Sequence, residues 1–254
     1  MNEKLRKILL KAFDEEIESR LCKRLKDNIP RIKDLRDLHK GQRCFIVATG
    51  PSLKHTNLSL LKDEIVFGIN SLCTGNFGIK YKYYAINDAK VWAIYYKEIL
   101  KEDTTFLLGR SSAKSFTTIA KRYPHINPIC FDFNKKLLDA DVVDEDITHG
   151  LYNTRQIVGL TLQIINFMGF DEVYLLGCDC DYSGSHHFDD SVYDFQSPTS
   201  QKQVSSYWQG TFKEYEIIKS IFDKNNRKIF NATVGGQLEV FDRVKLEDVL
   251  SKNW

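Results

Sequence analysis

The chain has 254 residues, and its 36 Lys and Arg against 34 Asp and Glu give a formal net charge of +2. That length suits one large α/β domain, or one domain with a small appendage. The near-neutral charge argues against a nucleic-acid-binding module, 12% aromatic residues argue against disorder, and 14 Gly with 5 Pro exclude a collagen-like chain.

The six cysteines indicate a reduced compartment, because several lie in or beside apolar runs, where a free thiol serves as a small core residue. Residues 1–25 carry charges throughout, unlike a signal peptide, and no apolar stretch approaches the ~20 residues that span a bilayer. We therefore expect a cytoplasmic protein without a disulfide framework, at the inner face of the membrane if its N-terminal segment binds lipid.

Residues 1–41 differ in charge from the remainder, with 12 Lys and Arg against 8 Asp and Glu. Apolar residues recur there at every fourth position, which predicts an amphipathic helix over residues 3–27: Leu5, Leu9, Phe13, Ile17, Leu21 and Leu25. Pro30 is expected to end this helix or to start a second short one. The helix could pack on the main domain, form a homo-oligomer, or lie on an anionic membrane face.

From residue 42 to residue 254 the pattern alternates between strands and helices. The predicted strands are residues 43–48, 64–69, 82–86, 105–108, 129–133, 172–176 and, as the last, 228–231. The predicted helices lie near 59–62 and at 89–100, 113–122, 151–168 and 206–223. Continuous apolar strands separated by helices predict a mostly parallel sheet covered on both faces, a Rossmann-like doubly wound α/β fold. The polar stretch 183–205 interrupts this rhythm and is a candidate lid.

Ligands of doubly wound sheets bind beyond the carboxyl ends of the strands. Compact polar residues follow five predicted strands, and they are Thr49, Gly50, Pro51 and Ser52; Asn70 and Ser71; Asn87 and Asp88; Asp179, Asp181 and Tyr182; and Asn231 and Thr233. The first turn lacks both the G-x-G-x-x-G pattern and a Walker lysine, which argues against ordinary dinucleotide binding and P-loop hydrolysis. Gly50 would let the backbone approach a ligand closely.

Two further segments carry candidate site residues. Thr148 and Gly150 precede the longest predicted helix, where Thr148 or Asn153 could cap its N-terminus and Arg155 could reach a phosphate or a carboxylate. His186 and His187 follow the strand ending at residue 176, and either could serve as a general base. Their adjacent spacing does not match a helical metal site, so no metal ligands are assigned.

Four segments in fixed order carry a resemblance to known families: residues 44–53 (CFIVATGPSL), 66–71 (VFGINS), 147–152 (ITHGLY) and 173–179 (VYLLGCD). They resemble the bacterial lipooligosaccharide sialyltransferases that use CMP-sialic acid. They equally resemble the family named for the archaeal 6-hydroxymethylpterin pyrophosphokinase, which includes motility-accessory-factor glycosyltransferases that modify flagellin. Residues 231–244, with Tyr182 and His187, are more similar to bacterial members of the second family. The resemblance covers residues 42–245.

The sialyltransferase resemblance implies a GT-A-like variant of the Rossmann fold with a lid, and metal-independent, inverting transfer from a CMP-linked sugar. It implies that the turn Gly50, Pro51 and Ser52 approaches the nucleotide phosphate or ribose, that Asn70 contacts the nucleotide, and that Thr148 and Gly150 line the donor site. Their places at the strand ends make Thr49, Asn87, Asp88 and Asp179 further candidate nucleotide-binding residues. Tyr182 would hydrogen-bond the departing phosphate. Two positions differ from that family, because Thr49 replaces an asparagine and the segment just before and within the helix predicted at 206–223 has no histidine where the family has its catalytic one.

We therefore expect a glycosyltransferase that moves a sugar, such as a sialic acid, from a nucleotide donor to a surface-glycan or glycolipid acceptor. His187 or His186 would remove the proton of the acceptor hydroxyl. One alternative is an ATP- and Mg²⁺-dependent pterin-type diphosphokinase, in which Asp88, Asp179 and Asp181 would lie near the phosphates. Another is a catalytically idle subunit that binds nucleotide or glycan.

Overall fold

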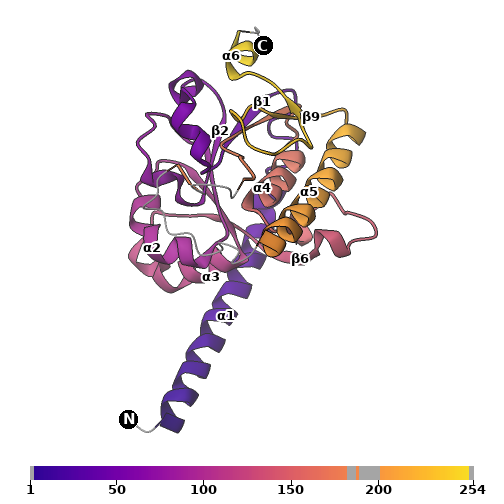
Figure 1. The fold of residues 1–254 in the computed structure, drawn as a ribbon. Coiled ribbons are helices and arrows are strands. Elements are labelled where there is room, and N and C mark those ends of the chain that lie inside the picture. Colours follow the sequence, from indigo (N-terminus) through magenta and orange to yellow (C-terminus); the bar gives the residue numbers. More distant parts are fainter. Residues whose placement is uncertain (1–2, 182–186, 189–200, 252–254) are drawn as a thin grey trace.

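The computed structural model describes residues 3–181, 187–188 and 201–251. Its main sheet has eight strands in the order β10-β9-β8-β1-β2-β3-β4-β5, and every pairing in it is parallel (Figure 1). The strands are β1 (Arg43–Val47), β2 (Val66–Ile69), β3 (Tyr83–Ile86), β4 (Thr105–Gly109), β5 (Ile129–Phe131), β8 (Glu172–Leu176), β9 (Lys228–Asn231) and β10 (Asp242–Arg243). Because β1 pairs with both β2 and β8, the strand order reverses beside β1.

The strands bury alternate side chains on opposite faces of the sheet. In β1, Cys44 and Ile46 pack on one face, whereas Phe45 and Val47 pack on the other. Helices α4 (Ile157–Met168) and α5 (Gln201–Lys224) cover the first face; α2 (Ala89–Ile99), α3 (Arg110–Ile119) and α6 (Leu246–Leu250) cover the second. The doubly wound, mostly parallel α/β fold predicted from the apolar strands is confirmed.

Short elements connect the main ones. The 3₁₀ helices are η1 (Pro51–His55), η2 (Leu58–Leu61), η3 (Asn70–Thr74), η4 (Ala120–Arg122), η5 (Leu137–Asp139) and η6 (Ile147–His149). Strands β6 (Phe133–Lys136) and β7 (Leu151–Asn153) form a separate two-stranded sheet. The prediction that residues 228–231 form the last strand is wrong, because β10 follows β9 and pairs with it.

The helix predicted from residue 151 begins later, at Ile157. The side chain of Gln163 explains the difference, because it accepts a hydrogen bond from the Tyr152 amide at 2.8 Å and donates one to the Tyr152 carbonyl at 2.9 Å. These two bonds hold Tyr152 in the extended conformation of β7. The helical interpretation of 151–156 was wrong because a buried glutamine on α4 satisfies this backbone.

Helix α1 (Glu3–Lys33) is continuous through Pro30, so the prediction that this proline ends the helix or starts a second short one is wrong. Proline in a helix interior normally kinks or breaks it. Here residues beyond the proline are anchored to the domain, since Ile32 is buried and Arg31 donates to backbone carbonyls at 2.7 and 2.9 Å. Among the helices in the described ranges, none combines the length and the apolar character needed to cross a membrane.

The C-terminal half of α1 covers the edge strand β5. The Asn28 side chain accepts a hydrogen bond from the Cys130 amide at 3.1 Å, and Arg31 donates to the carbonyls of Asn127 and Pro128. An uncovered edge strand would present unpaired backbone groups to other chains. Helix α1 therefore acts as a cover for this side of the sheet.

We predict that Leu21→Ala destabilises the protein by about 2–5 kcal/mol, because the Leu21 side chain of α1 is fully buried in the core of the domain. Leu10→Ala in the same helix is the matched control, since Leu10 is 57% exposed and its loss should change stability by less than about 0.5 kcal/mol. Urea denaturation measures both. Equal effects of the two substitutions would contradict the packing described for α1.

Candidate active site

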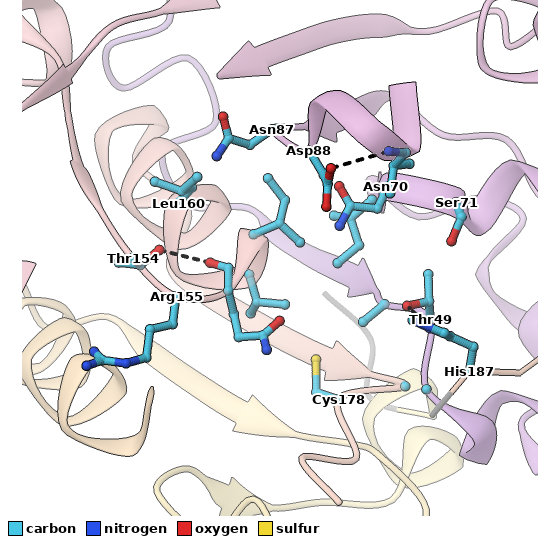
Figure 2. A pocket seen from close by; sticks show the side chains of 18 of the residues that line it. Thr49, Asn70, Ser71, Asn87, Asp88, Thr154, Arg155, Leu160, Cys178 and His187 are labelled. Atoms are coloured by element: carbon cyan, nitrogen blue, oxygen red, sulfur yellow. Dashed lines mark hydrogen bonds between the residues drawn. The ribbon is translucent and has the colours of Figure 1, made fainter. Parts of the chain in front are cut away.

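A cavity of about 460 Å³ lies at the carboxyl ends of four neighbouring strands, at the point where the strand order reverses (Figure 2). Ligands of open α/β sheets bind in this position. The strand ends contribute Thr49 and Gly50 from β1, Asn70 and Ser71 from β2, Asn87 and Asp88 from β3, and Gly177 to Asp181 from β8. Of the predicted nucleotide-binding residues, these strand ends therefore bring Thr49, Gly50, Asn70, Asn87, Asp88 and Asp179 together.

The turn after β1 is joined to the turn after β8 by the buried Asp179 carboxylate. It accepts hydrogen bonds from the Ser52 hydroxyl at 2.8 Å and from the Ser52 amide at 3.2 Å. Burial raises the pKa of Asp179, and the bonds from Ser52 oppose that rise. A Cβ atom at Gly50 would collide with this carboxylate, so the approach requires glycine. Ser52 and Pro51 consequently shape the turn without lining the cavity.

Asn70 and Asn87 each present a buried side-chain oxygen that has no hydrogen-bond partner. Both residues line the cavity, at the ends of β2 and β3. Asn70 has a positive φ of 47°, which is uncommon for a residue other than glycine and is typical of functional sites. The buried Tyr84 hydroxyl holds that backbone by donating to the Asn70 carbonyl at 2.9 Å. A ligand that donates N–H or O–H groups would satisfy both oxygens.

Asp88 lines the cavity but already has a structural task. Its Oδ1 accepts hydrogen bonds from the amides of Lys90 at 2.7 Å and Val91 at 3.3 Å, and so it caps the N-terminus of α2. Helix α4 differs, because its N-cap residue Gln156 makes no side-chain capping bond. The start of α4, rather than that of α2, is therefore the end suited to an anion.

His187 lies at the rim of the cavity next to Thr49. The Thr49 hydroxyl and the His187 Nδ1 are 3.1 Å apart, and the Phe188 amide donates to the Thr49 carbonyl at 2.8 Å. Phe188 is buried and packs edge-on against Phe77. These contacts anchor His187 beside the first strand end. The predicted site residues Tyr182 and His186, with most of the predicted lid 183–205, lie outside the described residues.

Thr148 and Gly150 lie elsewhere. They line a second hollow of about 230 Å³ against α1, together with Cys22, Lys26 and Asp132. Neither Thr148 nor Asn153 caps α4, contrary to expectation, because Gln156 occupies the N-cap position. The structure therefore does not bring the 148–150 turn to the main cavity.

The end of β9 is also separate from the cavity, so four rather than five strand ends meet there. Asn231 donates to the Leu238 carbonyl at 2.7 Å, and the Thr233 hydroxyl accepts from the Cys178 amide at 3.0 Å. These residues support the turn after β8.

Burial raises the pKa of Cys178 and raises that of Cys180 to about 12, which keeps both thiols protonated.

Arg155 lines the cavity, but its guanidinium points away from Asn70 and His187 in Figure 2. It forms an ion pair of 2.7 Å with Glu214 on α5, whose side chain is 3% exposed and also accepts from the Arg155 amide at 2.9 Å. Burial raises the pKa of Glu214, and Arg155 opposes that rise. Of the two partners expected for Arg155, a phosphate or a carboxylate, the structure shows a carboxylate, and this ion pair ties the loop before α4 to α5.

The sequence interpretation missed several cavity residues, among them Ser111, Thr154, Gln156, Trp208 and Tyr215. Thr154 and Gln156 were assigned to a helix that starts later, and Trp208 and Tyr215 belong to a helix whose cavity-facing side depends on tertiary packing. The polar run 154–156 between two apolar segments was the available signal. In the described ranges, no group of three or more His, Cys, Asp or Glu is placed to hold a metal ion.

We predict that Arg155→Ala destabilises the protein by about 2–4 kcal/mol, because it leaves the buried Glu214 carboxylate without its cation. The pKa of Glu214 should then rise further. A carboxyl group whose pKa is higher in the folded than in the unfolded state lowers the free energy of unfolding as the pH rises. The stability lost through Arg155→Ala should therefore be larger at about pH 8 than at about pH 5. Urea denaturation at both pH values tests this. Arg155→Ala combined with Glu214→Gln should remove the pH dependence, and an unchanged dependence in that double variant would contradict the assignment.

Comparisons with known proteins return structures but no family. No protein-family model matches the chain, and a search of curated proteins finds no match. One similar structure is the sialyltransferase CstII from Campylobacter jejuni with the substrate analogue cytidine-5′-monophosphate, at 18% identity and a TM-score of 0.52, covering 85% of this chain and 88% of that chain. Another is the sialyltransferase CST-II with an asparagine-to-alanine substitution, in complex with CMP, at 17% identity and a TM-score of 0.51, covering 84% and 89%. At these identities the similarity establishes a shared fold.

Proposed function

We propose that this protein is a glycosyltransferase that transfers a sugar from a CMP-activated donor, with a sialic acid as the favoured sugar. The observation that carries the proposal is the pair of buried, unpartnered side-chain oxygens of Asn70 and Asn87 in one cavity. The cavity lies at the strand-order reversal of a fold shared with CMP-bound sialyltransferases.

Cytosine fits these two asparagines chemically. Its exocyclic amine donates two hydrogen bonds, whereas uracil presents a carbonyl oxygen at the corresponding position. A carboxamide oxygen that accepts from this amine would distinguish CMP from UMP. The ribose hydroxyls offer further donors for whichever asparagine the base does not reach.

The donor phosphate would lie at the N-terminus of α4. Ile157 and Val158 line the cavity at this helix start, which has no side-chain cap, so its first amides suit an anion. Lys90 also lines the cavity and adds a positive charge. In this arrangement Arg155 would act by positioning the loop before α4 rather than by contacting the phosphate.

His187 is the proposed general base. If the Thr49 hydroxyl accepts the Nδ1 proton, Nε2 is the ring atom that takes the proton of the acceptor hydroxyl. The acceptor oxygen then forms a bond to the anomeric carbon, while the bond from that carbon to the CMP phosphate oxygen breaks and CMP leaves with the electron pair. We also propose that Tyr182 hydrogen-bonds the leaving phosphate and that the acceptor is a surface glycan or glycolipid.

We predict that CMP binds and that Asn87→Ala lowers its affinity by about tenfold, because one hydrogen bond to the ligand is lost. Protein stability should stay nearly constant, since the Asn87 oxygen has no partner within the protein. Isothermal titration calorimetry with CMP, UMP, AMP and GMP measures the affinities, with CMP expected to bind most tightly. Asn57→Ala, outside the cavity, is the control.

If none of these nucleotides gives a heat of binding, the proposed function is contradicted. Tighter binding of ATP with Mg²⁺ than of CMP would instead favour the diphosphokinase. CMP binding without any turnover across a panel of CMP-sugars and glycan acceptors would favour an idle binding subunit.

We predict that His187→Gln lowers kcat by about 10²–10⁴-fold without weakening CMP binding, because the variant cannot take up a proton. Release of CMP from CMP-sialic acid in the presence of acceptor glycans measures the rate. Thr49→Val should lower the rate as well, since it removes the hydroxyl that orients the imidazole, whereas Thr49→Ser should retain activity. Full activity of His187→Gln would eliminate the base assignment and leave the class of enzyme intact.

A further inference from the structure

Helix α1 extends beyond the domain that it covers (Figure 1). In its C-terminal part Ile17 and Leu21 are 7% and 0% exposed, whereas Leu10 and Phe13 in its N-terminal part are 57% and 58% exposed. The spacing of Leu10, Phe13, Ile17 and Leu21 places them on one side of the helix. The apolar stripe that packs on the domain therefore continues onto a projecting segment, residues 3–13, which the domain does not cover at Leu10 and Phe13.

The sign of the charge along α1 changes at the point where the helix begins to pack on the domain. The projecting segment carries four cations, Lys4, Arg6, Lys7 and Lys11, and one acid, Glu3. Acids are concentrated in the next five residues, where Asp14 and Glu18 form ion pairs with Lys114 and Arg110 of α3. Glu15 lies 3.9 Å from Lys11 of the projecting segment, and both side chains are exposed. Asp14 and Glu18 thus match the basic surface of the domain, whereas the projecting segment has an excess of cations in its own sequence that matches an anionic surface.

We propose that the projecting segment of α1 binds an anionic lipid surface, with Leu10 and Phe13 inserted among the acyl chains. An amphipathic helix that combines apolar side chains with cations lies in the interface of such membranes. The segment spans about 16 Å at 1.5 Å per residue, which is three helical turns and suits reversible attachment. A second copy of this chain is the less suitable occupant, because pairing two projecting segments would bring their cations together.

Vesicle co-sedimentation of the full chain tests the proposal. Vesicles of phosphatidylcholine mixed with phosphatidylglycerol should bind the protein, whereas vesicles of phosphatidylcholine alone should bind it at least about tenfold more weakly. Raising the salt concentration should release it, because salt screens the attraction. Binding should occur with or without CMP, so its failure would leave the proposed function intact.

Two kinds of variant separate the apolar and the basic contributions. Phe13→Asp should lower vesicle binding by about tenfold or more, and the double variant Lys7→Glu, Lys11→Glu should do the same. Leu38→Asp is the matched control, since Leu38 is 54% exposed but lies outside α1, and it should bind like the unchanged protein. Circular dichroism checks that each variant is folded, and Leu10→Asp replaces Phe13→Asp if that variant is not.

Three results would overturn the proposal. The first is absent binding, or equal binding to the charged and uncharged vesicles. The second is a loss of binding in Leu38→Asp as large as that in Phe13→Asp. The third is sedimentation in solution that shows a dimer dissociated by Phe13→Asp, which would assign the projecting segment to a second copy of the chain.

Discussion

The Asp179 carboxylate is buried between the turns that follow β1 and β8, and its hydrogen bonds to Ser52 fix one turn against the other. Removing a carboxylate from water is costly unless its oxygens are satisfied, so Ser52 and Gly50 are constrained together: one supplies the donors and the other the space. Because these turns flank the reversal of strand order, their geometry determines where Thr49 and the β8 loop meet the cavity. The shape of the proposed nucleotide site thus depends on the hydrogen bonds between Asp179 and Ser52, even if a ligand contacts neither residue.

The fold could be predicted because its strands are short apolar runs buried on both faces, and such runs alternating with helices are typical of a parallel sheet. The cavity could also be located from the sequence, because ligands of parallel sheets bind at the carboxyl ends of the strands. This rule failed at β9, whose polar residues support the neighbouring turn. Local patterns also failed where a distant side chain decided the outcome, as when Gln163 holds Tyr152 extended and Arg31 anchors the end of α1 beyond Pro30.

Within the candidate site, the sequence predicted many of the polar residues that line the cavity. It did not predict which of them are engaged with other protein groups and which are available to a ligand. Asp88, Asp179 and Arg155 all line the cavity, yet each is engaged with protein: a helix cap, a turn and an ion pair with Glu214. Asn70 and Asn87 retain unpartnered oxygens, and that distinction depends on three-dimensional neighbours that are remote in sequence. Charge alone was therefore a poor guide, and the uncharged amides are the stronger candidates for ligand recognition.

Helix α1 covers the open edge of β5 through Asn28 and Arg31. At the opposite end of the sheet, β10 contributes only two residues, which is too short to template another strand. The cover also precedes the strand it covers by about a hundred residues of chain, so on the ribosome it is synthesised first. When β5 emerges, its protecting helix is already available, and the interval in which a growing sheet could pair with a neighbouring nascent chain is short.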